Sequence, residues 1–190
     1  MKHIELPVAL DDILKLKLGD EVAISGMLVT ARDTAHKYMI ENWPVWIEPL
    51  LKNGAIYHCG PVTRKTETGY EALSAGPTTS IREEPYAHQI IARYGPRIII
   101  GKGGMGQSTL NAMKTHGAVY VHAIGGAASV IAKTIRKIHH VHMLEEFGAP
   151  EAFWELEVER FTGVVTMDAH GHSLHENIRK TSEEILHALL

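Results

Sequence analysis

Apolar residues along the chain follow two spacings, and the change from one to the other marks the expected elements. Runs of β-branched and other apolar residues predict strands at residues 21–32, 54–62, 97–100, 118–123 and 155–171. Helical spacing predicts helices at residues 33–43, 81–94, 107–115, 127–138 and 173–190. The polar residues 63–74 predict a loop. Strand and helix alternate from residue 97 onward, which favours a sheet with some parallel pairs.

The expected fold class is therefore α/β, with a mixed sheet and flanking helices. The chain has 190 residues, which suits one large domain, so we expect a single domain over residues 1–190. Hydrophobic residues make up 45% and charged residues 22% of the chain, which is typical of a globular protein with a sizeable core.

Charge and targeting signals exclude several classes of function. The formal net charge is −3, so the chain has no basic field for nucleic acid. No long apolar run predicts a membrane span. The first twelve residues lack the apolar segment and small-residue cleavage site of a secretory signal, so we expect a cytoplasmic protein.

The chain has a single cysteine, Cys59. One thiol cannot form an internal disulfide, and it cannot hold a metal cluster without ligands from elsewhere. Any iron–sulfur chemistry would therefore need a partner. By itself, Cys59 is expected to pack as a small hydrophobic residue.

Three cations stand where predicted strands give way to helices. Arg32 lies in T-A-R-D, Arg82 in G-P-T-T-S-I-R-E-E, and Lys102 in G-K-G-G-M-G. Unpaired N–H groups at a helix start favour anions, and an adjacent cation strengthens that preference. The three segments together favour a ligand with more than one carboxylate or phosphate.

Helix capping offers a simpler interpretation of two of these segments. Ser80 with Glu83 fits a capping box, as does Thr30 with Asp33, and Arg32 could pair with a neighbouring acid at the surface. Capping does not account for two further features of the second segment, the hydroxyl of Thr78 and the cation of Arg82.

The glycine run and the histidines suggest other ligands. Residues 101–106 fit G-x-G-x-x-G after a strand, yet the next strand has no acid to bind a ribose, so a nucleotide site has weak support. Histidines 139, 140 and 142 would lie at the polar end of the predicted helix 127–138, and histidines 170 and 172 in a turn. Solvated histidines are a better interpretation than a zinc site, so no metal ligands are predicted.

Six ordered motifs, which span nearly the whole chain, resemble the β subunit of class I, iron–sulfur-dependent fumarate hydratases and L-tartrate dehydratases. They are T-A-R-D-T-A-H-K (30–37), H-C-G-P (58–61), G-P-T-T-S-I-R (76–82), G-K-G-G-M (101–105), G-G-A-A (125–128) and E-E-F-G-A-P-E-A-F-W-E-L-E-V (145–158). The resemblance implies a "swivelling" β/β/α domain. It also implies an α subunit, in an α2β2 assembly, whose three cysteines hold a [4Fe-4S] cluster.

The resemblance also implies roles for individual residues. Arg32, Arg82 and Lys102 would bind the carboxylates of a small dicarboxylate, and Thr78 would be the base that removes the C3 proton of malate. An acid from the α subunit would protonate the departing hydroxyl. Three neighbours, Asp33, His36 and Thr79, would support these groups without catalysing the reaction.

The function implied is the reversible hydration of fumarate to L-malate together with the α subunit. The chain departs from the family pattern at Ile81, where many relatives carry glycine, and at Glu83-Glu84, where Met-Asp is common. These departures bear on the substrate, so dehydration of L-tartrate to oxaloacetate is the first alternative, and a methylated fumarate is another possible substrate. A non-catalytic module that binds an anion or a nucleotide is the second alternative. A neighbouring gene for the cysteine-bearing subunit would favour the enzyme.

Overall fold

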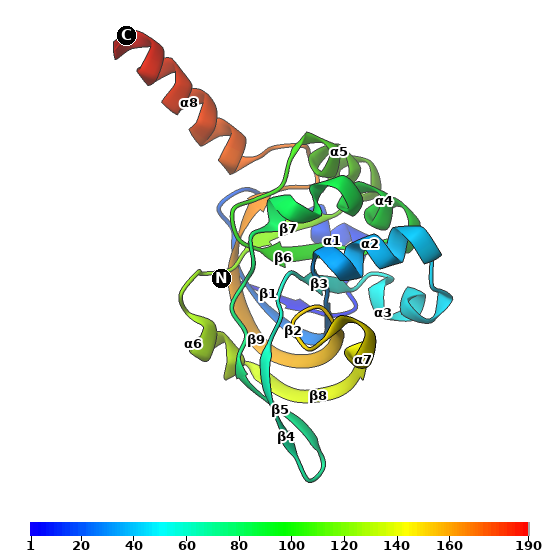
Figure 1. Cartoon of the computed structure of the whole chain (residues 1–190). Coiled ribbons are helices and arrows are strands. Elements are labelled where there is room, and N and C mark those ends of the chain that lie inside the picture. Colours follow the sequence, from blue (N-terminus) through cyan, green and yellow to red (C-terminus); the bar gives the residue numbers. More distant parts are fainter. Residues whose placement is uncertain (190) are drawn as a thin grey trace.

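The structure is a computed structural model that describes residues 1–189. Its main feature is a seven-stranded sheet in the order β1-β2-β3-β6-β7-β9-β8 (Figure 1). The strands are β1 (Lys2–Glu5), β2 (Glu21–Thr30), β3 (Ala55–Tyr57), β6 (Ile98–Gly101), β7 (Val119–His122), β8 (Ile135–His142) and β9 (Phe153–Met167). The neighbours β1, β2, β3, β6 and β7 pair in parallel, and β9 pairs antiparallel with β2, β7 and β8. The predicted mixed α/β fold is confirmed.

The sheet closes on itself through β9. One part of this long strand pairs with β7, and most of it pairs with β2, so β2, β3, β6, β7 and β9 form a ring. A register shift in β2 lies at Gly26, where φ is +105° and a Cβ would stand 2.7 Å from the backbone oxygen of Leu6. Glycine permits both this backbone conformation and the close approach of a neighbouring segment.

Alternating side chains of the parallel strands enter two apolar layers. In β6, Ile98 and Ile100 pack inside the ring, whereas Ile99 packs outside it against the helices. This two-sided burial explains why β6 reads as a continuous apolar run. The helices that cover the outer face are α2 (Asp33–Asn42), α3 (Glu48–Leu51), α4 (Glu84–Tyr94) and α5 (Gln107–His116). Both α4 and α5 are crossovers between parallel strands, and α5 is the one that the alternation from residue 97 onward predicted.

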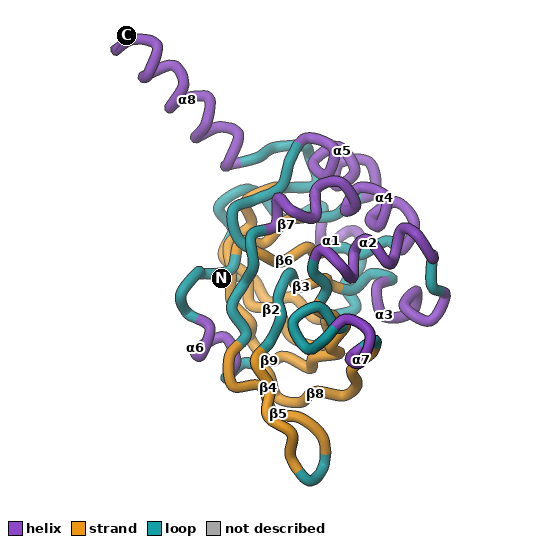
Figure 2. The backbone as a smooth tube through the Cα atoms, in the orientation of Figure 1, coloured by secondary structure: helices purple, strands orange, loops and turns teal. Residues whose placement is uncertain are grey.

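The predicted loop at residues 63–74 is wrong. The structure has an antiparallel hairpin there, β4 (Val62–Thr66) and β5 (Gly69–Ser74), which projects from the body (Figure 2). Most of its side chains are exposed or half-buried, so the hydrophobic alternation that identifies a half-buried strand is weak.

The predicted helix at residues 127–138 is also wrong. It is replaced by a short helix, α6 (Ala128–Ala132), and by strand β8. Apolar residues recur every third position in β8, at Ile135, Ile138 and Val141, which imitates helical spacing. Register shifts against β9 interrupt the strand between these residues, and all three pack against the core.

The remaining elements are short, except for the last. They are α1 (Leu10–Ile13), two 3-10 turns, η1 (Val45–Ile47) and η2 (Ser80–Glu83), and α7 (Leu144–Phe147). The last helix, α8 (Leu174–Leu189), confirms the helix predicted at residues 173–190, although residue 190 lies outside the described part, and it projects from the body (Figure 2). Across residues 1–189 no helix combines the length and the apolar character needed to cross a membrane.

Candidate functional site

Parallel pairing brings three chemically distinct residues to one edge of the sheet. The carboxyl ends of β2, β3 and β6 lie side by side, because Thr30 pairs with Tyr57 and Tyr57 with Ile100. The residues that follow these ends are Ala31-Arg32, His58 and Lys102. Ligand sites of open α/β sheets lie at this edge.

The segment G-P-T-T-S-I-R crosses the same edge and pairs with its backbone. The Thr78 N–H donates to the His58 carbonyl at 2.7 Å, and the Lys102 N–H donates to the Thr78 carbonyl at 3.2 Å. The Ser80 N–H in turn donates to the Lys102 carbonyl at 3.0 Å. Thr78 is therefore fixed between the ends of β3 and β6.

The Thr78 hydroxyl has a defined orientation. It donates to the His58 carbonyl at 2.9 Å, and the side chain is half-buried. Because the proton points to that carbonyl, the oxygen lone pairs face away from it. Thr79 is exposed on the same segment and forms an isolated bridge with Lys102.

Arg32 lies against an acid that the sequence interpretation missed. Its Nη2 is 3.2 Å from Glu151 Oε1, its Nη1 donates to the Pro150 carbonyl at 3.4 Å, and its side chain is 20% exposed. Glu151 belongs to the motif at residues 145–158, so the motif carried the signal, but nothing local in it identified the partner of Arg32.

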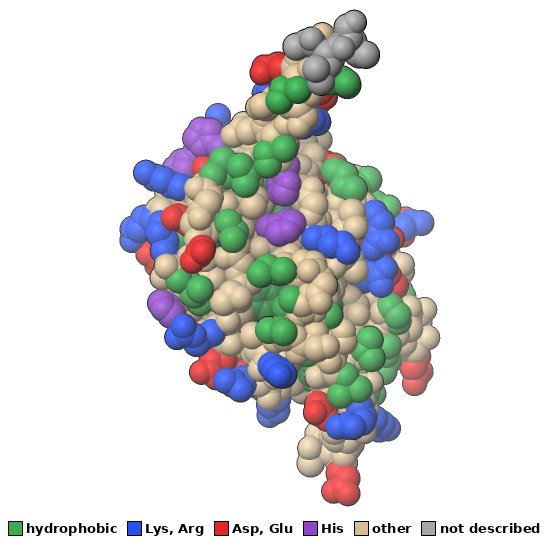
Figure 3. All heavy atoms as spheres, turned by 90° about the vertical axis from the view of Figure 1, so that its left-hand side faces the viewer, with side chains coloured by type: hydrophobic (Ala, Val, Ile, Leu, Met, Phe, Trp, Pro, Cys, Tyr) green, Lys and Arg blue, Asp and Glu red, His purple; other side chains and the backbone are tan. Residues whose placement is uncertain are grey.

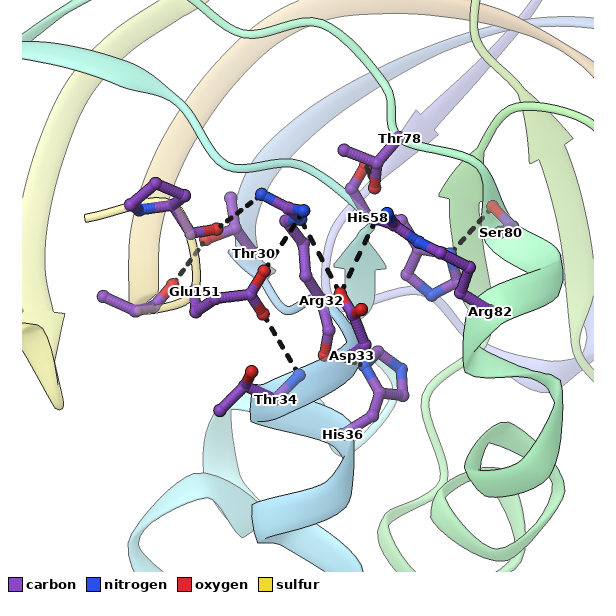
Figure 4. A network of polar contacts seen from close by, with 12 residues as sticks. Thr30, Arg32, Asp33, Thr34, His36, His58, Thr78, Ser80, Arg82 and Glu151 are labelled. Atoms are coloured by element: carbon purple, nitrogen blue, oxygen red, sulfur yellow. Dashed lines mark hydrogen bonds and ion pairs between the residues drawn. The ribbon is translucent and has the colours of Figure 1, made fainter. Parts of the chain in front are cut away.

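Asp33 lies between the two arginines. Its Oδ1 is 3.9 Å from Arg32 Nε and 3.6 Å from Arg82 Nη2. Figure 4 shows both guanidinium groups turned towards Asp33, with Thr78 beside them. The side chain of Arg82 is 43% exposed, so it has the more accessible guanidinium. The Arg32–Asp33 pair that the sequence left open is present, but the interaction is long and shared with Arg82.

Two of the three helix starts bind carboxylates of this same chain. The Thr34 N–H in α2 donates to Glu151 at 3.1 Å (Figure 4). At α5, the N–H groups of Gly106 and Thr109 donate to Glu84 at 2.8 and 3.2 Å. The expectation that all three helix starts are free for an external anion is therefore wrong for α2 and α5.

Neither predicted capping box forms. The Thr30 hydroxyl accepts from the Trp154 N–H at 3.0 Å and lies 3.3 Å from the Ala152 carbonyl, so it joins β2 to the start of β9. The Ser80 hydroxyl is 2.8 Å from both His58 Nδ1 and the Tyr120 hydroxyl. Burial explains both results, because a buried hydroxyl must bond to the groups that surround it.

Two buried histidines lie beneath the arginines. His36 Nδ1 is 2.9 Å from the Arg32 carbonyl, so this nitrogen donates, and the His36 ring packs edge-on against His58 with centroids 5.0 Å apart. Burial lowers the pKa of His36 from 6.5 to about 4, and it also lowers the pKa of His58, with a further contribution from Arg82. Both imidazoles are therefore neutral at pH 7. His36 contacts the backbone of Arg32 through this hydrogen bond.

Lys102 is exposed at the end of β6. A Cβ on Gly125 would lie 3.9 Å from Lys102 Cδ, and Gly76 lies against Ala128, with its Cβ position 3.0 Å from the Ala128 Cβ. The G-G-A-A segment therefore borders both Lys102 and G-P-T-T. Figure 3 shows basic, histidine and hydrophobic side chains exposed on the face that carries α6.

Packing accounts for the glycine run after β6. A Cβ on Gly104 would stand 2.4 Å from the His175 ring, and a Cβ on Gly106 would stand 2.7 Å from Glu84. Gly101 has even less space, because a Cβ would stand 1.9 Å from Ser80 Oγ. Close contacts thus account for Gly101 and Gly106, whereas Gly103, whose nearest neighbour would be 3.9 Å away, is explained by its φ of +83°; neither reason requires a nucleotide.

Among the described residues, no group of three or more His, Cys, Asp or Glu side chains is arranged to hold a metal ion. Cys59 is fully buried in the core, and burial raises the pKa of its thiol to about 12. A thiol of that kind does not supply the thiolate that an iron–sulfur cluster needs. The described residues of this chain therefore do not fit a [4Fe-4S] cluster.

The histidine groups have structural partners. Histidines 139, 140 and 142 lie on β8, not at a helix end; His139 pairs with Glu157 at 2.7 Å, and His142 pairs with Glu155 at 2.6 Å. In the turn after β9, His172 Nδ1 is 2.9 Å from Asp168.

The sequence of this chain is similar to that of known proteins over almost its whole length. It matches the family described as "Fumarase C-terminus" over residues 1–178. A "Putative fumarate hydratase class I" of Geobacillus stearothermophilus is 52% identical over 96% of this chain, and the aligned region is 35% of that protein. The "L(+)-tartrate dehydratase subunit beta" of Escherichia coli (strain K12) is 35% identical over 96% of this chain and 90% of its own length.

A third relative has the same extent as this chain. The "Putative L(+)-tartrate dehydratase subunit beta" of Methanocaldococcus jannaschii is 39% identical over 94% of this chain and 93% of its own length. The chain thus spans about a third of the Geobacillus relative and nearly all of the two β subunits. The resemblance predicted from the six motifs is confirmed, and the chain belongs to the fumarase C-terminal family.

Proposed function

We propose that this chain is the β subunit of a fumarate hydratase, which hydrates fumarate reversibly to L-malate together with an α subunit that bears a [4Fe-4S] cluster. The observation that carries the proposal is the convergence of Thr78, Arg32, Arg82 and Lys102 at the carboxyl edge of the parallel strands. In this proposal the three cations bind a dicarboxylate, and Thr78 acts on its C3 proton.

The charges of the site suit this reaction. Removal of a proton next to a carboxylate builds negative charge on that carboxylate, and preorganised cations lower the energy of the state in which this charge develops. Lys102 and Arg82 are the exposed cations, whereas Arg32 is held by Glu151 and Asp33. We assign substrate binding to all three, with Arg32 as the most rigid.

Thr78 is the proposed catalytic base. Its hydroxyl is fixed by the His58 carbonyl, with lone pairs free to face the substrate. A threonine hydroxyl is a weak base in water, so the assignment requires a cationic site from which water is excluded. Asp33 and His36 hold the arginine side chains and the Arg32 backbone, and Thr79 supports Lys102.

The partner is part of the proposal. The described residues of this chain do not fit the cluster, so the cluster would belong to the α subunit, in an α2β2 assembly. Hydrophobic side chains at the border of the site favour such a covering subunit: Ile81 is 51% exposed, Ile124 63% and Val130 65%. A covering subunit would also exclude water from Thr78.

A second candidate is the β subunit of an L-tartrate dehydratase, which converts tartrate to oxaloacetate. Relatives with that name align over at least 90% of their own length, whereas the fumarate hydratase relative is about three times as long as the aligned region. The anion site has the chemistry to bind either dicarboxylate, and substrate preference in the assembled enzyme distinguishes them.

The test is anaerobic co-expression of this chain with a cluster-bearing α subunit, followed by assays with malate, tartrate and methylmalate. We expect malate turnover by the complex and none by either subunit alone. Thr78→Ala should abolish turnover without loss of iron or sulfide from the complex. Lys102→Ala and Arg32→Ala should raise KM, and Lys65→Ala, which removes an exposed lysine from the β4–β5 hairpin, is the matched control.

The outcomes separate the candidates. If the complex prefers tartrate, then tartrate and not malate or fumarate is its substrate, and the assignment of the site residues still holds. Thr78→Ala with wild-type turnover would remove Thr78 from the mechanism, and unchanged KM in both cation variants would reject the assignment of substrate binding to Lys102 and Arg32. A folded complex that is inactive with all three acids would contradict an enzyme and favour the anion-binding module.

A further inference from the structure

Unsatisfied polar atoms gather beneath the candidate site. Of the eight buried side-chain nitrogen or oxygen atoms without a hydrogen-bond partner in the described part of the chain, six belong to five residues: Arg32, Asp33, His36, His58 and Glu83. About nine in ten buried polar atoms are normally hydrogen-bonded, so a cluster of exceptions calls for an explanation.

Glu83 is the most unusual member of this group. It is the last residue of η2, its side chain has no exposed surface, and neither carboxyl oxygen is hydrogen-bonded. It follows Ser80 by three residues, and such side chains lie above one another in a 3-10 turn. Its neighbour Glu84 instead binds the start of α5, so the two adjacent acids have different surroundings.

The groups around Glu83 come from three elements. The charges of Arg82, which precedes it in η2, and of Arg32 and Asp33 at the start of α2 affect the pKa of Glu83. The charge of Glu83 in turn affects the pKa of Tyr120 in β7. The two buried imidazoles of His36 and His58 lie in the same region and are neutral at pH 7. Glu151 binds Arg32 from the opposite side.

Charge counting shows what an ionised Glu83 would do. Arg32 and Arg82 carry two positive charges, and Asp33 and Glu151 already supply two negative ones. A third carboxylate would leave these two arginines and their acids with a net charge of −1, which the third proposed binding cation, Lys102, would only bring to zero. When Glu83 is protonated, the two guanidinium groups are neutralised by Asp33 and Glu151 and by no additional negative charge from Glu83.

Hydrogen bonding favours the protonated form as well. His36 Nδ1 donates to a carbonyl, so its buried Nε2 is an acceptor, and an ionised Glu83 would add only further acceptors. Burial raises the pKa of Glu83 from 4.5 to about 7, although the two arginines partly lower it. The geometry and the raised pKa of Glu83 therefore favour the same, protonated form.

We propose that Glu83 is a positioning residue of the anion site, which must carry a proton for Arg32 and Arg82 to bind a dicarboxylate. This inference rests on the proposed function for the identity of the ligand. A bound anion close to Glu83 disfavours its ionised form, so binding takes up a proton when the pH is near or above 7. The affinity for the dicarboxylate therefore falls as the pH rises.

The test compares wild type with Glu83→Gln, which keeps the shape of the side chain and cannot ionise. Calorimetric titration of L-malate, and of L-tartrate in parallel, into the complex with the α subunit measures affinity from pH 7 to 8.5. Repetition in two buffers of different ionisation enthalpy gives the number of protons taken up. Glu155→Gln is the control, because Glu155 is also buried but pairs with His142.

Wild type and Glu155→Gln should lose about 15-fold in affinity between pH 7 and 8.5, and should take up about half a proton at pH 7 and close to one at pH 8.5, whereas Glu83→Gln should lose less than twofold and take up none. A wild-type complex that binds either acid with no proton uptake, or a Glu83→Gln variant with the wild-type pH dependence, overturns the inference and leaves the proposed function standing.

A second measurement does not depend on the substrate. Carboxyl carbon NMR of the full chain labelled at glutamate should contain a resonance that is absent from Glu83→Gln and titrates close to pH 7. A Glu83 resonance that titrates near the ordinary value of 4.5 overturns the inference even if the enzyme is active.

Discussion

Burial of His36 should reduce the stability of this protein as the pH falls below 6.5, whereas the raised pKa of Glu83 acts in the opposite direction over the same range. The folded-state pKa of His36 is about 4 against an ordinary value of 6.5, because the ring is fully buried beneath Arg32. Between these two pH values the unfolded chain binds a proton that the folded chain excludes. The contribution of His36 to stability is therefore complete above pH 6.5 and is lost as the pH falls towards 4.

The magnitude follows from the difference between the two pKa values. At 1.36 kcal/mol per pH unit, protonation of His36 in the unfolded state should remove about 2 kcal/mol by pH 5 and about 3 kcal/mol by pH 4. Most small domains are stable by only about 5 to 15 kcal/mol, so the effect is large. His58 adds a loss of the same sign, because burial lowers its pKa too.

The variant His36→Asn isolates the contribution of one ring. Asparagine retains an N–H group that can donate to the Arg32 carbonyl, but it does not titrate. We expect the variant to be less stable than wild type at pH 7.5, because it packs less well. Its deficit should shrink by about 2 kcal/mol at pH 5.

Urea unfolding of the full chain at pH 7.5, 6.5, 5.5 and 5 measures this difference. His116→Asn is the control, because His116 is exposed at the end of α5, and its curve should run parallel to that of wild type. If the curves of His36→Asn and wild type are also parallel, the burial of a neutral His36 does not govern acid stability, and the reasoning is refuted.

Three further predictions concern stability. Glu83→Gln should be more stable than wild type by up to about 3 kcal/mol above pH 7, with the advantage gone below pH 4.5, because a raised acid pKa costs stability as the pH rises; urea unfolding at pH 4.5 and 8 checks this. Gly101→Ala should cost at least about 2 kcal/mol in chemical unfolding, since its Cβ would overlap a buried hydroxyl, whereas Gly125→Ala, with its nearest atom at 3.9 Å, should cost less than about 0.5 kcal/mol. Thr30→Val should cost about 1 to 3 kcal/mol by leaving a buried N–H unsatisfied, and Thr162→Val on the exposed face of β9 should be near neutral in the same assay. Equal stability of either variant pair would contradict the packing described.

The parallel part of the fold could be predicted because its strands are buried on both faces. Continuous apolar runs such as residues 98–100, each followed by a helix with Gly at its end, leave few alternatives. The ring closure could not be predicted, since nothing local in residues 153–167 specifies that β9 bends from one partner strand to another. The three-residue spacing of Ile135, Ile138 and Val141 is typical of a helix. In the structure it belongs to a strand with register shifts against β9, and these shifts cannot be inferred from the sequence.

The part of the candidate site that could be predicted consists of polar and charged residues close to the ends of strands. Arg32, Thr78, Arg82 and Lys102 could be identified from the sequence, because each lies in a polar segment between a strand and a helix. Their partners are remote in sequence: Glu151 lies 119 residues from Arg32, and only the folded chain shows that it already neutralises that guanidinium. The Ser80–Glu83 capping box failed for the same reason, since the folded chain buries both side chains.

The most direct test of the proposed function is L-malate dehydration by the anaerobically assembled complex, measured with wild-type chain, Thr78→Ala and Thr78→Ser at equal cluster content. The proposal predicts turnover with wild type, none with Thr78→Ala, and partial recovery with Thr78→Ser, which restores the hydroxyl. Wild-type turnover in Thr78→Ala, or a fully loaded wild-type complex that dehydrates neither malate nor tartrate, would contradict it.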